Sequence, residues 1–219
     1  MEAAPDIALW RLLAGYSLLA IPVALALILR LKLLKDLLVS TGRMSAQLFL
    51  ASILLVYLFD WNNSWLNLSW VFLMIMFACF SSLKNSGLLI KRYFAAIFLA
   101  YLAGAGGVLL FFILVIVNPV NFFSAQLLVV VGGMLLGNSM NSIVIGIRHY
   151  FDRLKREQKD YQFLISLGAS QREALLPFFR EAVMAALRPV FSPMAPMGIV
   201  FFPGMMTGQI LGGANPETA

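Results

Sequence analysis

The chain contains six apolar runs of a length suited to crossing the hydrocarbon core of a bilayer. A charged content of only 12% leaves too little polar surface to cover a soluble domain of 219 residues. The sequence therefore predicts an all-α polytopic bundle of about six transmembrane helices, forming a single transmembrane domain over residues 1–219. The six runs are residues 9–29, 44–59, 66–83, 94–117, 122–147 and 182–211.

The loops between these runs alternate in charge. The first, third and fifth loops carry Lys and Arg residues, whereas residues 60–65 and 118–121 have none. Because cytoplasmic loops are enriched in Lys and Arg, we expect the basic loops in the cytoplasm and the N-terminus outside. The same bias accounts for the net charge of +6, so no nucleic-acid partner is needed to explain it.

The longest polar segment, residues 148–188, contains eight of the sixteen Lys and Arg residues. Its first part, residues 148–167, places opposite charges four positions apart, as in Arg153 and Glu157. This spacing supports a helix whose charged face is in water. Apolar residues recur on the other side at helical spacing, which indicates that this side packs on a partner.

A break and a second helix follow. Gly168 favours a helix end, because the residue after a helix often needs a positive φ that glycine adopts at little cost. Ser170 and Glu173 have the spacing of a capping box, in which the two residues satisfy free backbone groups at the start of a helix. The sequence therefore predicts a cytoplasmic helix-turn-helix over residues 148–181.

Glycines four positions apart occur in the last two runs. Gly133 and Gly137 lie in the fifth run, and Gly204, Gly208 and Gly212 lie in the sixth. Small residues at this spacing allow the backbones of two membrane helices to approach closely. They therefore predict a packing face on each run.

Amide and thioether side chains occur in the same two runs. Polar groups inside a membrane need partners and often mark a pathway, whereas methionine either offers a soft metal ligand or fills a gap in packing. Pro189, Pro193 and Pro196 also predict that the sixth run is broken or kinked. Helix packing and a translocation path both stay open, and no metal ligands are assigned. The residues concerned are Gly133, Gly137, Asn138, Met140, Asn141, Pro203, Gly204, Met205, Met206, Thr207, Gly208 and Gln209.

Catalytic motifs are missing from the chain. The sequence contains no GxxxxGK[ST] phosphate loop and no HExxH or GxSxG motif. We therefore expect a protein that is not an enzyme, and any ATP-driven work must come from another chain.

Three segments, residues 133–141, 166–174 and 203–213, together resemble the FetB family of bacterial ABC-transporter permeases. That family is associated with iron export and is similar to plant proteins of aluminium tolerance. The resemblance implies an inner-membrane permease subunit, working as a homodimer with a separate ATPase that holds ATP and Mg, and no cofactor in this chain. Family members usually continue beyond the position of Ala219 with one more span. The residues that the resemblance places against the ATPase are Gln162, Leu167, Gly168, Ala169, Ser170, Arg172 and Glu173.

Two other functions stay open on the sequence alone. The basic segment could recruit a cytoplasmic partner to a membrane scaffold that transports nothing. The bundle could also be a channel that works without ATP. Association with an ATPase distinguishes the permease from both alternatives.

Overall fold

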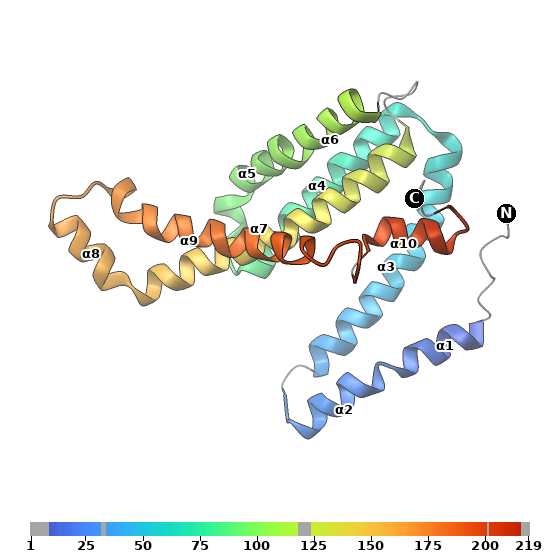
Figure 1. The fold of residues 1–219 in the computed structure, drawn as a ribbon, viewed down its shortest axis with the longest axis horizontal. Helices are drawn as coiled ribbons and strands as arrows, with labels where there is room; N and C mark the ends of the chain where they lie inside the picture. The colour runs from blue at the N-terminus through green and yellow to red at the C-terminus, as the bar shows by residue number, and fades with distance from the viewer. Residues whose placement is uncertain (1–8, 32–33, 118–123, 201, 216–219) are drawn as a thin grey trace. The chain divides into compact units, whose positions relative to one another are not determined.

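The computed structural model describes residues 9–31, 34–117, 124–200 and 202–215 (Figure 1). The regular secondary structure of these residues is helical throughout, which confirms the predicted all-α fold. Contacts divide the chain into two compact units. The larger unit is Leu58–Ala195, and the smaller unit combines Met1–Tyr57 with Pro196–Ala219. The single transmembrane domain stays a prediction.

Among the described residues, four helical segments are long and apolar enough to cross a membrane. They are Leu34–Trp61, Ser64–Ser86, Ile90–Val117 and Gln126–Arg156. They correspond to the second to fifth predicted runs. The expected outer loop at residues 118–121 and the predicted start of the fifth run at Phe122 lie outside the described residues.

The smaller unit holds α1 (Leu9–Ser17), α2 (Ala20–Ile28), most of α3 (Leu34–Trp61) and α10 (Gly204–Leu211). The first predicted run is therefore two short helices. The second run was predicted too short, because its helix starts at Leu34 and not at residue 44. Charged residues do not end a helix by themselves, and Asp36 in the first turn suits the positive end of the helix dipole.

The larger unit is built on α4 (Ser64–Ser86), which packs on α5 (Ile90–Tyr101) and α7 (Gly132–Arg156). The helix that contains α5 continues through η1 (Leu102–Gly106), α6 (Gly107–Phe111) and η2 (Phe112–Val117), and η3 (Gln126–Val131) leads into α7. The segments η1, η2 and η3 are π-helical. Apolar side chains of α4, such as Ile75 and Leu83, form the centre of the core.

Two polar contacts hold this core in register. The hydroxyls of Ser82 and Tyr101, both buried, lie 2.7 Å apart and join α4 to α5. The Oδ1 atom of Asn62 accepts hydrogen bonds from the backbone N–H of Ala125, at 3.0 Å, and from Nδ2 of Asn67, at 3.2 Å. The turn before α4 is thereby fixed to the residue before η3.

The sixth predicted run is broken, as expected. Helix α9 (Gln171–Phe191) continues through Pro177 and Pro189, and a 3-10 turn, η4 (Ser192–Met194), follows it. The next helix, α10, starts only at Gly204. The break therefore falls where Pro193 and Pro196 each remove a backbone donor, and Pro189 lies inside the helix.

Candidate functional site

The predicted helix-turn-helix forms an arm, which we define as residues 148–181. It comprises the end of α7, the short helix α8 (Gln158–Ser166) and the first half of α9. Figure 1 shows α8 at the end of this arm, beyond the α4, α5 and α6 helices of the same unit. The site therefore lies on a segment outside the packed core.

The first helix of the arm was predicted wrongly as continuous over residues 148–167. Helix α7 ends at Arg156, and Glu157 leaves the helical conformation with φ −104° and ψ 34°. The Nε atom of Arg153 donates to the carboxylate of Glu157 at 3.1 Å, and a second nitrogen of Arg153 forms an ion pair with Glu181 of α9. Arg153 thus joins the bend at Glu157 to α9. The spacing of charges along one helix does not predict this contact between helices.

The corner of the arm is as predicted. Gly168 has φ +92°, in the region that favours glycine. Its N–H donates to the carbonyl of Ile165 at 3.0 Å, and the N–H of Ala169 donates to the carbonyl of Leu164 at 3.1 Å. These bonds satisfy carbonyls that the end of α8 would leave free.

The capping box at the start of α9 is also confirmed. The backbone N–H of Ser170 donates to the Glu173 carboxylate at 2.8 Å, and the Ser170 hydroxyl accepts from the Glu173 N–H at 3.3 Å. Hydrogen bonds from the N–H and the hydroxyl of Ser170 hold the pKa of Glu173 below its usual range. The box fixes the direction in which α9 leaves the corner.

Acid is expected to loosen this cap. Because the folded-state pKa of Glu173 is lowered, the stabilisation is present above the ordinary pKa of a glutamate and is lost as the pH falls through the folded pKa. Hydrogen exchange of the Ser170 amide, corrected for its intrinsic pH dependence, should therefore speed up in that window. Glu173→Gln, which accepts a hydrogen bond but does not titrate, should abolish the dependence. The same pH profile in both proteins would contradict this role of the carboxylate.

A close contact joins α7 to α9 where the arm meets the bundle. A Cβ atom added to Gly146 would lie 3.1 Å from Cβ of Ala186 and 3.4 Å from the carbonyl oxygen of Ala182. This contact was not predicted. Ala182 and Ala186 have the small-xxx-small spacing of a packing face, and this is the signal that could have identified α9 as the partner of α7.

The base of the arm is fixed to α4 by Arg148. Both Nε and a terminal nitrogen of its guanidinium donate to the backbone carbonyl of Asn85, in the last turn of α4. A cation at this position satisfies a free carbonyl and suits the negative end of the helix dipole. The arm is therefore tied to the core of the unit and not only to its own helices.

The residues predicted on the fifth run have different surroundings. A Cβ atom on Gly133 would lie 3.2 Å from the methyl group of Met74, whereas one on Gly137 would meet no described atom within 4 Å. Asn138 and Asn141 are exposed on the surface of α7, and Met140 is half-buried. Gly133 thus packs closely on α4, whereas Gly137 has no such contact among the described residues.

The residues predicted on the sixth run lie in or next to α10, in the other unit. The hydroxyl of Thr207 donates to the carbonyl of Pro203 at 3.2 Å. The other residues of this group are Gly204, Met205, Met206, Gly208 and Gln209. Their packing on the fifth run stays a prediction, and the described residues contain no group of three or more His, Cys, Asp or Glu side chains placed to hold a metal ion.

The residues expected to contact an ATPase are gathered at the corner of the arm. Gln162, Leu167 and Arg172 are exposed, and Ala169 is half-buried. Large apolar side chains are also exposed there, Phe163 at 62% and Leu167 at 68%, with Ile165 at 37%. Phe163 was not predicted, and its signal was an aromatic residue next to the apolar positions Tyr161, Leu164 and Ile165 of the same helix.

Comparison with known proteins places the chain among membrane proteins. Residues 9–219 match the model of the uncharacterised protein family UPF0014. The chain is 32% identical over 193 residues to the "Probable iron export permease protein FetB" of Escherichia coli (strain K12), covering 87% of this chain and 72% of the relative. It is 30% identical over 202 residues to "Protein ALUMINUM SENSITIVE 3" of Arabidopsis thaliana, covering 90% and 72%. No solved structure matches the chain.

Proposed function

Since the chain belongs to the UPF0014 family and is a multi-pass membrane protein, we propose that it is the permease subunit of an ABC transporter. Its substrate in this proposal is a metal ion such as iron, or a metal complex, moved out of the cell. A separate subunit binds ATP and Mg and hydrolyses the ATP. Two copies of the chain act together in the inner membrane, with the N-terminus outside. The relative named as a probable iron export permease supports the substrate class.

The observation that carries the proposal is the corner of the arm. Gly168 and the capping box give this corner a defined backbone, and Phe163 and Leu167 present apolar surface on it. Large apolar side chains on a polar segment indicate a protein interface. In our proposal they dock on the ATPase, together with Gln162 and Arg172.

The contacts of the arm explain how movement would reach the membrane. Arg153 joins α7 to α9 through Glu181, and Gly146 packs directly on Ala186. A push on the corner therefore moves the two helices as a pair. Arg148 passes the load to the last turn of α4.

The face of α7 that carries Asn138 and Asn141 is the proposed translocation surface. These residues lie three positions apart and therefore on one side of the helix. Both are exposed, although α7 belongs to a segment apolar enough to cross the membrane. An amide facing lipid is costly, so the face needs either water or another protein surface. Amide oxygens along a water-filled path can replace part of the hydration shell of a metal ion.

The test is reconstitution with an ATPase. The chain should co-purify with an ABC ATPase, and membrane vesicles containing both proteins should accumulate iron only when ATP is supplied on the side of the arm. Replacing both Asn138 and Asn141 with leucine should cut transport at least about tenfold while the complex stays assembled, because the face loses its polar groups. Met134→Leu, an apolar exchange on the same helix, is the matched control.

Two results would contradict the proposal. Iron movement through the chain alone, without an ATPase, would favour a channel. Failure of any ABC ATPase to bind, with another cytoplasmic protein bound at the arm instead, would favour a scaffold.

A further inference from the structure

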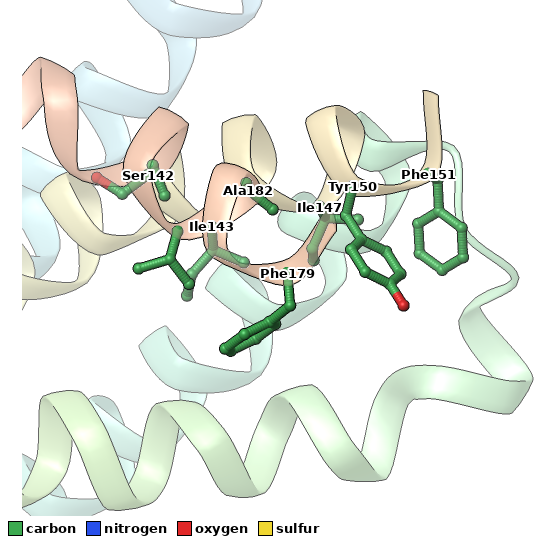
Figure 2. A pocket seen from close by; sticks show the side chains of 10 residues that line it. Ser142, Ile143, Ile147, Tyr150, Phe151, Phe179 and Ala182 are labelled. Carbon is green, nitrogen blue, oxygen red and sulfur yellow. The ribbon is translucent and has the colours of Figure 1, made fainter. Parts of the chain in front are cut away.

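An open groove runs between α7 and α9 where the arm meets the bundle (Figure 2). Its volume is about 420 Å³, which is within the range of about 300–1,000 Å³ that is usual for small-molecule sites. Figure 2 shows Ile143, Phe179 and Tyr150 projecting to the same side of the helix pair. The residues that line the groove are Ser142, Ile143, Gly146, Ile147, Tyr150, Phe151, Phe179, Ala182, Val183 and Ala186.

The surface of the groove is apolar throughout. A water-soluble ligand would find no charged group in it, and polar parts of such a ligand would lose their hydrogen bonds to water without replacement. A hydrocarbon chain forms no hydrogen bonds with water, so it loses none on entering the groove. The groove therefore fits an alkyl chain better than a polar metabolite.

The two ends of the groove differ. Helices α7 and α9 are antiparallel here, since Gly146 packs on Ala186 and Arg153 pairs with Glu181 farther along the arm. Ser142 and Ala186 thus mark the end within the apolar helix, and Phe151 and Phe179 mark the end beside the polar arm. An alkyl chain lying in the groove has one end in the hydrocarbon of the bilayer and the other at the water interface.

Two cations, Arg180 and Lys155, are sequence neighbours of the residues that line the arm end of the groove and do not line it themselves. Arg180 directly follows Phe179 and lies three positions before Val183, on the flank of α9 beside the lining residues. Lys155 lies one turn beyond Phe151 on α7. Among the described residues neither has a carboxylate partner, whereas Arg153 is occupied by Glu157 and Glu181.

We propose that this groove binds an anionic phospholipid, with one acyl chain between α7 and α9 and the phosphate beside Arg180 and Lys155. Basic residues next to a crevice between membrane helices are the arrangement that recognises anionic headgroups. Tyr150 also suits the interface, because its ring is apolar and its hydroxyl can reach water. The inference rests on membrane insertion and does not depend on an ATPase or on the transported substrate.

The test is lipid retention measured by mass spectrometry of the intact protein. The full chain is reconstituted in vesicles of equal parts phosphatidylglycerol and phosphatidylcholine and extracted in mild detergent. The mass of the protein with its bound lipid is then measured. Wild-type protein should retain one phosphatidylglycerol per chain, with a preference of about tenfold over phosphatidylcholine. Added glycerol phosphate should not displace it, because the acyl chain supplies part of the binding.

Two variants distinguish binding of the acyl chain from recognition of the headgroup. Val183→Trp fills the groove and should abolish retention of both lipids, whereas Arg188→Trp, on the side of α9 away from the groove, should not. Arg180→Gln should abolish only the preference for phosphatidylglycerol, whereas Arg188→Gln, on the side of α9 away from the groove, should leave it intact. Arg180 is exposed, so this variant should insert and fold normally.

The following outcomes would overturn the proposal. One is equal retention of the two lipids by the wild-type protein, and another is an undiminished preference for phosphatidylglycerol in Arg180→Gln. Efficient cross-linking between Val183→Cys residues of two copies would show that a second chain covers the groove. Displacement by glycerol phosphate alone would identify a phosphate site without a lipid chain.

Discussion

Gly168→Val is expected to lower stimulation of the partner ATPase by about tenfold while the protein still inserts into the membrane. The residue has φ +92°, and a β-branched side chain is strained in this region by about 1–3 kcal/mol. A cost of about 1.4 kcal/mol corresponds to a tenfold change in the population of the native corner. The measurement is ATP hydrolysis by the reconstituted complex, with the amount of permease in the membrane determined separately.

The matched control is Gly168→Asn. Asparagine enters the left-handed region more readily than other residues, so this variant should retain most of the stimulation. Normal stimulation by Gly168→Val would mean that the corner does not carry the coupling. Equal loss of stimulation in both variants would show that position 168 must lack a side chain, whatever its backbone conformation.

Gly146→Leu is expected to separate α7 from α9 and to lower both stability and transport. The shortest contact of an added Cβ is 3.1 Å, to a methyl group on the facing helix. Overpacking of this kind costs about 1–3 kcal/mol, which corresponds to about 2–12 °C in the midpoint of thermal unfolding for a chain of this size. The single cysteine, Cys79, is fully buried, so a thiol-reactive dye reports unfolding directly.

Gly137→Leu provides the comparison. It is the same exchange on the same helix, but an added Cβ there would meet no described atom within 4 Å. Its melting temperature should not fall below that of the wild type, since replacing a helical glycine also removes backbone entropy from the unfolded chain. Equal destabilisation by the two variants would show that the contact of Gly146 is not special.

The sequence predicted those parts of the arm that depend on neighbouring residues. Gly168, Ser170 and Glu173 lie within six consecutive residues, so their spacing alone was sufficient. The break after α9 was predicted for the same reason, because each proline removes its own backbone donor. The apolar runs predicted the long helices, although α3 begins ten residues before its predicted run, in a segment that contains charged residues.

The contacts that orient the arm could not be predicted from local spacing. Arg148 bonds to a carbonyl 63 positions away, and Gly146 meets Ala186 across two helices. Gly133 and Gly137 had the stronger sequence pattern, but a glycine pattern does not say which helix approaches it. The bend at Glu157 depends on Arg153, which also pairs with Glu181, so it follows from tertiary contacts and not from helix propensity.

The prolines inside α9 determine where that helix can flex. Proline has no N–H, so Pro177 leaves the carbonyl of Glu173 without its helical hydrogen bond, and Pro189 does the same for Ala185. Bending is easiest where such bonds are missing. The stretch between the two prolines, which holds the contacts with Arg153 and Gly146, therefore acts as a stiff rod with one compliant joint at each end. Deformation is concentrated at these joints, so the stiff stretch can move together with α7 and keep its contacts with Arg153 and Gly146.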